Sequence, residues 1–530
     1  MFVGFWVSAI CASQSMAAEF HVTNATEFRD TLNTTEINGE DDIIYLAAGT
    51  YTGSFGYHPA ETEHKSLTIA GEPGTNSSQI ILDGQNLKGV LTFYDDTSAG
   101  PIADITVRGI TIQKGLGSGG VSGLRMRFLG GGNTNISIVD CIIKENSGPG
   151  YGAGIVIEAD GAGNVLLENN LIINNITTER DDTDCRGGGV AILYSGTGEV
   201  TVRNNIIANN SASGITAPQG GGLWIQEGIV HFIGNTIYNN QANRGGGVYF
   251  GSANAANVYN NIIYGNTGIE GGDIYFGNPT TANGYNNNYS NLHGTWTDSG
   301  NNLNTDPLFV DAENNDFHLL PTSPMINAGT TAVPDPPGLP TTDFEGSSRV
   351  IGTAPDIGAY EWSRVSPSEG TIGTEITITG SENDIKRGKI LIGTASLKIL
   401  EWTGDSIRSL LSKALPPDTY DLTIRPKTKG SSPIIIANGF TVKAPEISSI
   451  NPTNGSTGNE ISISGSFFGG KKGKVTLGKK NCKVLSWTMD KTTGASGIHF
   501  VVPKGLSPGT HELIVTTTKV GSDTVNFTVE

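Results

Sequence analysis

Short runs of apolar residues alternate with Gly- and Asn-rich turns over much of the first half of the chain, and their order repeats. Five heptapeptides with an apolar centre and polar ends align without gaps: 140–146, 169–175, 204–210, 234–240 and 260–266. Their last residues are separated by steps of 29, 35, 30 and 26 residues. A period of this length is typical of solenoid repeats.

Each period contains two more short runs with the alternation of apolar and polar positions that β-strands show. One follows a Gly-rich turn, as in 220–223, and the other precedes the Asn pair, as in 200–202. Because strands this short are unstable alone, each must stack on its counterpart in the next period, which gives three long parallel sheets. The sequence therefore predicts an all-β fold whose main body is a right-handed parallel β-helix solenoid.

One asparagine recurs at the same place in successive periods. Asn170, Asn205, Asn235 and Asn261 are expected to stand above one another when the coils stack. A side-chain amide both donates and accepts, so such a column can hydrogen-bond along the axis, as in stacked cross-β assemblies. These asparagines are therefore predicted to be structural.

The open end of such a stack would expose its core and its unpaired strand edges, and it needs a cover. Phe28 and Leu32 lie one helical turn apart, and Asn24 is placed to cap the N-terminus of a helix. We therefore expect a short amphipathic capping helix over residues 26–32.

Composition narrows the range of partners. Gly accounts for 73 of 530 residues, whereas charged residues make up only 16%. The net charge of −18 argues against nucleic acid or an anionic membrane surface as a partner and favours cations such as calcium. Cys141, Cys185 and Cys482 are too few and too scattered for a disulfide framework.

The first residues have the features of a secretory signal. An apolar run from Phe2 to Ala12 is followed by small residues, and cleavage is expected after Ala17 or Ala18. This run is too short to span a bilayer, and no later stretch is apolar enough to do so. We predict a signal peptide over residues 1–18 and a secreted or cell-surface protein without a transmembrane segment in the mature chain.

The pattern changes in the last third of the chain, where a longer unit occurs twice. Residues 376–380 match residues 461–465 at an offset of 85, and Trp402 and Trp487 keep the same offset. Evenly spaced short strands in copies of this size are typical of immunoglobulin-like β-sandwiches. The sequence predicts two such sandwiches, over residues 363–443 and 444–530.

Three parts of the chain resemble known families. Residues 19–305 resemble the right-handed parallel β-helix superfamily that includes pectate lyases, which implies the fold and not an activity. Residues 306–362 carry 306–309, 316–319, 323–329 and 356–361, motifs that resemble the choice-of-anchor Q domain. That resemblance implies a C-terminal part of the β-helix, with Asp343, Gly346 and Arg349 as turn and cap residues. The two sandwiches look like IPT/TIG domains, in which the resemblance implies spacers or binding modules.

An insertion in the longest period carries most of the candidate metal chemistry. Asp181, Asp182 and Asp184 lie within 176–186, beside Arg186. Clustered carboxylates can hold calcium against an acidic sugar, and a nearby Arg suits a lyase mechanism. The three aspartates are thus candidate calcium ligands, and a solvated turn is the alternative. The sequence assigns no catalytic residue and no further cofactor.

A second group of candidates arises from stacking the Gly-rich strands. Alternation turns Trp224, Tyr249 and Tyr275 outward, so they are expected to form an aromatic row on the surface. The residues just before the glycines align as a polar row beside it, and those of interest are Arg186, Gln219, Arg244 and Glu270. Aromatic and planar polar side chains together suit a sugar, whereas outward aromatics also occur simply because they favour β-sheet surfaces.

The lysines of the last module, Lys471, Lys472, Lys474, Lys479 and Lys480, are expected to form a solvated loop. Two functions remain open. The first is a protein that binds an extracellular polysaccharide or a cell-surface component along the β-helix, with the sandwiches as spacers. The alternative is a carbohydrate-active enzyme, either a calcium-dependent polysaccharide lyase or a glycoside hydrolase, which would need functional groups that converge in a groove.

Overall fold

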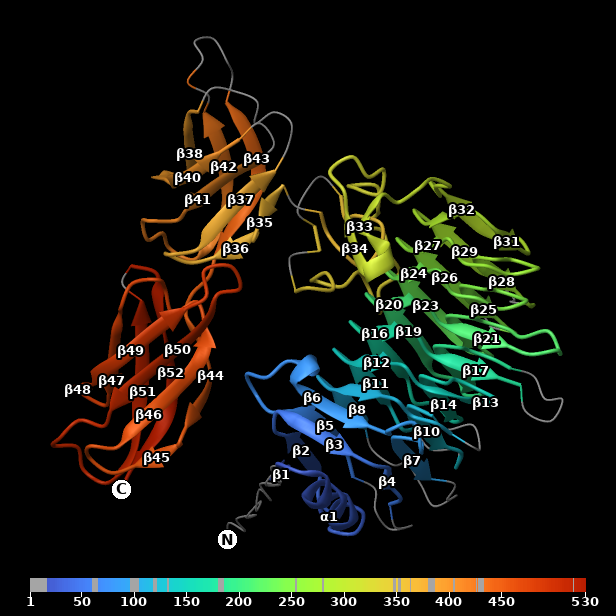
Figure 1. The fold of residues 1–530 in the computed structure, drawn as a ribbon, viewed down its shortest axis with the longest axis horizontal. Helices are drawn as coiled ribbons and strands as arrows, with labels where there is room; N and C mark the ends of the chain where they lie inside the picture. The colour runs from blue at the N-terminus through green and yellow to red at the C-terminus, as the bar shows by residue number, and fades with distance from the viewer. Residues whose placement is uncertain are drawn as a thin grey trace, which may run out of the picture. The chain divides into compact units, whose positions relative to one another are not determined.

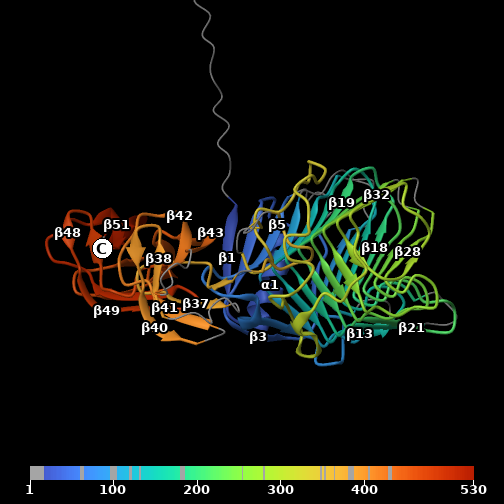
Figure 2. The same cartoon turned by 90° about the horizontal axis from the view of Figure 1, so that it is seen from above.

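The first part of the chain is a stack of β-coils, and the last part is two β-sandwiches (Figures 1 and 2). The computed structural model describes residues 17–59, 65–95, 104–117, 122–130, 133–179, 185–252, 255–278, 281–346, 349–350, 354–362, 364–379, 387–403, 406–425, 427, 433–517 and 519–530. The prediction of a parallel β-helix followed by two immunoglobulin-like sandwiches is confirmed.

Three long parallel sheets wind through the coils, and each coil adds a strand to each sheet. Sheet A consists, in order, of β1 (Ala18–Val22), β2 (Asp42–Leu46), β5 (Leu67–Gly71), β8 (Ile105–Arg108), β11 (Ile136–Val139), β15 (Val165–Glu168), β19 (Glu199–Arg203), β23 (Ile229–Ile233), β26 (Ala255–Tyr259), β29 (Ala282–Tyr285) and β32 (Asp298–Gly300). Sheet B consists of β3 (Gly49–Thr52), β6 (Ile80–Asp83), β9 (Thr111–Gln113), β12 (Ile142–Lys144), β16 (Leu171–Ile173), β20 (Ile206–Ala208), β24 (Thr236–Tyr238), β27 (Ile262–Tyr264) and β30 (Asn288–Tyr289). Sheet C consists of β4 (Phe55–Tyr57), β7 (Leu91–Asp95), β10 (Leu124–Phe128), β14 (Ile155–Ala159), β18 (Val190–Tyr194), β22 (Leu223–Ile225), β25 (Val248–Phe250), β28 (Ile274–Phe276) and β31 (Leu292–His293).

A short fourth sheet and a few isolated elements complete this part of the chain. Sheet D consists of β13 (Ser147–Pro149), β17 (Ile176–Thr178) and β21 (Ser211–Ser213). A 3-10 turn, η1 (Ser77–Gln79), precedes β6. After the last coil, β33 (Phe309–Asp311), the 3-10 turn η2 (Ala312–Asn314) and β34 (Asp316–Leu319) form an antiparallel hairpin.

Like residues stack on like residues, and this stacking creates the core. Val190, Leu223, Val248 and Ile274 are register partners in successive strands of sheet C, and all four are fully buried. Their neighbours in sequence face the opposite side of the sheet because side chains alternate along a strand. Each coil therefore adds one layer to a continuous apolar column.

The two adjacent asparagines of the repeat have different structural roles in the turn between sheets A and B. The first residue of each pair adopts the left-handed conformation that ends a strand of sheet A: φ is 55° at Asn169, 54° at Asn204 and 57° at Asn260. Gly234, with φ of 64°, and Asp140, with φ of 55°, take the same place in the other two aligned coils. Gly, Asn and Asp are the residues that visit this conformation most readily, which explains their use at this position.

The second asparagine of each pair points into the stack and joins a ladder. Asn170 Nδ2 donates to Asn205 Oδ1 at 3.0 Å, and Asn205 Nδ2 donates to Asn235 Oδ1 at 3.1 Å. Asn261 Nδ2 donates in the same way to Asn287 Oδ1 at 2.9 Å. All five side chains are fully buried, so the predicted column of asparagines is a buried hydrogen-bond chain along the axis.

A second ladder lies at the other end of the strands of sheet B. It consists of Asn146, Asn175, Asn210, Asn240 and Asn266. Asn266 Nδ2 donates to Asp273 Oδ1 at 3.0 Å, and Ser290 Oγ donates to the other carboxylate oxygen at 2.8 Å. Every amide in the row points its N–H toward the next coil, so the row ends at an acceptor-only group that faces its positive end.

The N-terminal end of the stack is covered by α1 (Ala25–Thr35), as predicted, although the helix is longer than the predicted segment. Phe28 and Leu32 are buried against the first coil. Asn24 caps the helix because its Oδ1 accepts from the backbone N–H groups of Thr26 and Glu27, both at 3.0 Å. Figures 1 and 2 show α1 at the end where β1 begins.

The two sandwiches have the same strand order. In the first, one sheet consists of β35 (Val365–Ser366), β37 (Glu375–Thr379), β41 (Ser406–Leu410) and β40 (Lys398–Trp402), and the other of β36 (Glu369–Gly370), β43 (Ile434–Val442), β42 (Asp418–Arg425), β38 (Lys389–Ile392) and β39 (Ala395–Ser396). In the second, the matching sheets are β44 (Glu446–Asn451), β46 (Glu460–Ser466), β50 (Ala495–Val501) and β49 (Lys483–Met489), and β45 (Asn454–Gly455), β52 (Gly521–Val529), β51 (Gly509–Thr517), β47 (Lys474–Leu477) and β48 (Lys480–Asn481). Strand for strand, this is the internal duplication that the 85-residue offset indicated.

Within the described part of the chain, no helix is both long enough and apolar enough to cross a membrane.

Candidate functional site

The predicted aromatic row lies on sheet C as one column. Trp224 is the register partner of Tyr249, and Tyr249 is the partner of Tyr275. The column continues to His293 on β31, which the sequence analysis did not identify. His293 lacks the Gly-rich turn that marked the other members, although it does stand at the outward position of its strand.

The rings of this column stack face to face along the axis. The ring centroids of Tyr249 and Tyr275 are 4.7 Å apart with planes 8° apart, and those of Tyr275 and His293 are 4.2 Å apart with planes 2° apart. The centroids of Trp224 and Tyr249 are 6.5 Å apart. Because each ring covers the face of the next, the column presents ring edges and hydroxyl groups to its surroundings.

Trp224 is the most enclosed member of the column. Only 3% of the surface of Trp224 is exposed. The Arg186 guanidinium lies 4.7 Å from the centroid of the Trp224 ring and 5.5 Å from that of Tyr151, and Gln219 Oε1 accepts from Trp224 Nε1 at 3.0 Å. Trp224 therefore anchors the column, whereas the half-buried Tyr249 and Tyr275 and the exposed His293 are the members that a ligand can reach.

The predicted polar row forms a ladder of its own beside the rings. Isolated parallel bridges connect Tyr151 to Arg186, Arg186 to Gln219, Gln219 to Arg244 and Arg244 to Glu270. Arg244 Nε donates to Glu270 Oε2 at 2.9 Å, and these side chains are 39% and 41% exposed. The Arg244 guanidinium also lies 5.9 Å from the Tyr275 ring. The structure thus brings the seven predicted residues together on the outer side of sheet C, in a group that we call the sheet C row: Arg186, Gln219, Trp224, Arg244, Tyr249, Glu270 and Tyr275. The expected surface position is wrong for Trp224, which its neighbours bury.

A charged cluster that the sequence analysis missed lies nearer the N-terminal end of sheet C. Arg125 Nη2 donates to Glu158 Oε2 at 2.6 Å, and Arg127 Nη1 lies 3.6 Å from the same oxygen. The Arg127 guanidinium lies 5.4 Å from the centroid of the Tyr94 ring. Alternation within 124–128 was the available signal, together with the Gly-rich segment 115–123 that precedes it.

The candidate calcium ligands Asp181, Asp182 and Asp184 lie outside the described residues. Among the residues that are described, no three His, Cys, Asp or Glu side chains are grouped so that they could hold a metal ion. The nearest described residues of the insertion are Glu179, whose Oε1 accepts from Thr216 Oγ1 at 2.7 Å, and the buried Cys185. The calcium site stays a prediction.

The segment that follows the last coil is held by buried charges. Arg349 is 1% exposed and donates to the backbone oxygens of Asp356 at 3.0 Å and Gly358 at 2.6 Å. Its Nη1 lies 3.5 Å from Glu361 Oε1. Burial raises the pKa of Asp356 to about 6 and also raises the pKa of Glu361, while Arg349 opposes both effects. These contacts agree with the expected cap role of Arg349, and the resemblance to the choice-of-anchor Q domain stays a prediction.

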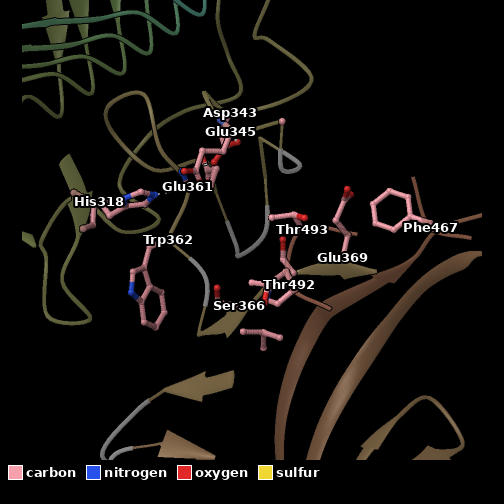
Figure 3. A pocket seen from close by; sticks show the side chains of 15 residues that line it. His318, Asp343, Glu345, Glu361, Trp362, Ser366, Glu369, Phe467, Thr492 and Thr493 are labelled. Carbon is pink, nitrogen blue, oxygen red and sulfur yellow. Dashed lines mark hydrogen bonds and ion pairs between the residues drawn. The ribbon is translucent and has the colours of Figure 1, made fainter. Parts of the chain in front are cut away.

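A cavity of about 720 Å³ borders this segment (Figure 3). His318, Glu345 and Trp362 are among its lining residues. His318 Nδ1 lies 2.6 Å from Asp316 Oδ1, and His318 Nε2 lies 3.3 Å from Glu345 Oε2. Hydrogen bonding to Glu345 raises the pKa of His318 to about 9 despite its partial burial. The ring is therefore a cation between two carboxylates at neutral pH. This arrangement holds the segment in place and does not provide a neutral imidazole that could act as a general base.

The comparisons with known proteins bear on the C-terminal part of the chain. Residues 445–529 match the family model of the IPT/TIG domain, which confirms the predicted family of the second sandwich. No curated protein matches the chain.

Several solved structures share a limited likeness. The extracellular region of plexin A4 matches with 14% identity and a TM-score of 0.21, covering 31% of this chain and 18% of that one. The γ-CGTase from alkalophilic Bacillus clarkii matches with 18% identity and a TM-score of 0.15, covering 30% and 21%. A surface glycan-binding protein from Prevotella bryantii matches with 16% identity and a TM-score of 0.17, covering 30% and 37%. The chain thus spans well under half the length of these structures.

Proposed function

We propose that the protein is exported and binds an extracellular polysaccharide along the outer face of sheet C, with the two sandwiches as spacers. The observation that supports this proposal is the reachable end of the sheet C row, where Arg244, Glu270 and Tyr275 lie side by side. The two charged side chains are each about two-fifths exposed. They are therefore ordered by the stack and open to a ligand at the same time.

The chemistry of this surface suits sugar hydroxyls. The Arg244 guanidinium has several N–H donors in a plane, and the Glu270 carboxylate accepts from hydroxyl groups. The stacked rings of Tyr249 and Tyr275 fix the floor of the surface and contribute phenolic edges. Because the coils repeat along the axis, such a surface extends in one direction, which suits a polymer better than a compact ligand.

The test begins with a glycan array on the intact protein, followed by calorimetric titration with the oligosaccharide that the array selects. Arg244→Gln is expected to weaken binding about tenfold, because a hydrogen-bonding cation is removed from the surface. Arg203→Gln is the matched control. Arg203 also pairs with a glutamate of a neighbouring coil, with its Nε 2.7 Å from Glu168 Oε1, but it lies on sheet A.

Equal affinities for Arg244→Gln and the parent protein, or no binding to any glycan, would overturn the proposal. Unsaturated product formed from polygalacturonate in the presence of calcium would instead support the lyase alternative. That assay uses the same protein preparation and detects turnover, which binding alone does not produce.

A further inference from the structure

A second cavity, of about 510 Å³, lies where the two sandwiches meet. The first sandwich contributes Ile372, Ser412, Lys413 and Ala414, and the second contributes Lys471, Lys472, Thr517 and Lys519. Half of this lining is lysine, and no acidic residue belongs to it. The lysines expected to form one solvated loop are divided: Lys471 and Lys472 line this cavity, Lys474 begins β47, and Lys480 lies on β48 with Lys479 just before it.

Close packing of two glycines joins the sandwiches at this point. Gly373 has φ of 105°, and a Cβ added there would lie 2.6 Å from the Cα of Gly470. The backbone N–H of Gly470 donates to the carbonyl oxygen of Ile372 at 2.7 Å. Only residues without a side chain allow the two backbones to approach this closely. The contact places Lys471 and Lys472, which follow Gly470 directly, against the first sandwich.

Further contacts across the junction support the same geometry. Lys491 Nζ lies 2.7 Å from Glu375 Oε1, and the backbone N–H of Glu375 donates to the carbonyl oxygen of Lys491 at 2.9 Å. Val520 of the second sandwich is buried in the apolar core of the first. The cavity is thus bounded by two modules that are joined by backbone hydrogen bonds, an ion pair and apolar packing.

The four lysines of the cavity lack acidic partners within the part of the chain that the structure describes. No ion pair there involves Lys413, Lys471, Lys472 or Lys519. Lys472 Nζ donates to the carbonyl oxygen of Val484 at 3.0 Å, which orients the ammonium without neutralising it. Four positive charges around one cavity repel one another. Such a concentration of positive charge is unusual in a chain whose net charge is −18. A bound anion would remove it.

We infer that this cavity, which we call the junction pocket, binds an acidic sugar unit of a polysaccharide. Ammonium groups attract a sulfate or carboxylate oxygen, and the Ser412 hydroxyl suits a sugar hydroxyl. Ile372 and Ala414 add an apolar wall for the C–H face of a ring. A volume of about 510 Å³ is within the range of small-ligand pockets. The pocket is separate from the sheet C row and does not depend on it.

Calorimetric titration of the full chain tests this inference with two probes of matched length, a heparin-derived oligosaccharide and an oligogalacturonide. The first carries sulfates and the second carries only carboxylates, so the two distinguish the anionic group. The double variant Lys471→Gln/Lys472→Gln is expected to weaken binding of the preferred probe about tenfold or more, because two charge-assisted contacts are lost. Lys413→Gln is expected to weaken it as well, since that lysine comes from the other sandwich.

The matched control is Lys479→Gln/Lys480→Gln, which removes the same charge from the same module away from the pocket. It is expected to change affinity by less than about twofold, the effect of distant exposed charges. Equal losses for both double variants would overturn the inference in favour of general charge attraction, and so would a failure of both probes to bind. Arg244→Gln separates this result from the fate of the sheet C proposal, because binding in the junction pocket should survive that substitution unchanged.

Discussion

At the scale of single residues, the repeat rests on two adjacent asparagines with different tasks. The first adopts a left-handed backbone that few side chains accept, and the second carries a buried amide that bonds to the coils before and after it. Neither task is visible in hydropathy alone, because a buried Asn looks like a surface residue on any polarity scale. The sequence could reveal it only through position, since the same amide recurs at the same step.

Substitution of one ladder residue tests this account. Asn210 Nδ2 donates to Asn240 Oδ1 at 3.0 Å and to the carbonyl oxygen of Ile172 at 2.9 Å, and its Oδ1 accepts from the backbone N–H of Asn175 at 2.9 Å. Asn210→Ala leaves buried groups without partners, so we expect it to lower the free energy of unfolding of the β-helix by about 3 kcal/mol. Urea unfolding followed by circular dichroism measures this change.

The control for that experiment is Asn283→Ala. Asn283 Nδ2 also donates to an asparagine of the neighbouring coil, Asn257 Oδ1, at 3.1 Å, but both residues are half-exposed on sheet A. Water can replace this bond, so we expect a loss below about 1 kcal/mol. Equal losses for Asn210→Ala and Asn283→Ala would contradict the role assigned to the buried ladder.

His318 gives the segment after the last coil a defined pH dependence. Hydrogen bonding to Glu345 raises the pKa of the folded-state imidazole from 6.5 to about 9. The stability that protonated His318 gives to the folded segment is therefore complete below about pH 6.5 and is lost as the pH rises to about 9. Titration of the His318 ring signals by NMR should give a midpoint near 9, and Glu345→Gln should lower that midpoint. A midpoint at the ordinary value would contradict the ion pairs.

At the scale of elements, the coils could be predicted and the exposure of their side chains could not. Period and alternation are sufficient to place Trp224, Tyr249 and Tyr275 in one outward column, because strands of successive coils pair in register. Whether a ring offers its face or its edge depends on how closely neighbouring rings approach. That distance is set by the stacking of coils, which the sequence of any one strand does not contain.

The capping helix offers a test at the same scale. Phe28 is fully buried, and its ring centroid lies 4.8 Å from that of Phe55 in the first strand of sheet C. Phe28→Ala removes this contact at a cost of about 3–5 kcal/mol. We expect hydrogen exchange to increase in the first coils while β22 and β25 stay protected, because a solenoid transmits stability mainly between neighbours. Asn33→Ala, on the exposed side of α1, should leave exchange unchanged.

At the scale of the whole molecule, the chain combines an elongated repeat with a duplicated sandwich. The duplication could be predicted from the sequence because paired motifs keep one offset, and the identical strand orders of the two sandwiches confirm it. The junction pocket could not be predicted, because it depends on the contact between Gly373 of one sandwich and Gly470 of the other. Lysines that are separated along the sequence converge only after that contact forms.

Sugar binding at the sheet C row is tested most directly by a crystal structure of the full chain with the oligosaccharide that the glycan array selects. We predict sugar density within hydrogen-bonding distance of Arg244, Glu270 and Tyr275 on the outer face of sheet C. Sugar bound elsewhere on the chain, with only solvent beside those three side chains, would contradict the claim.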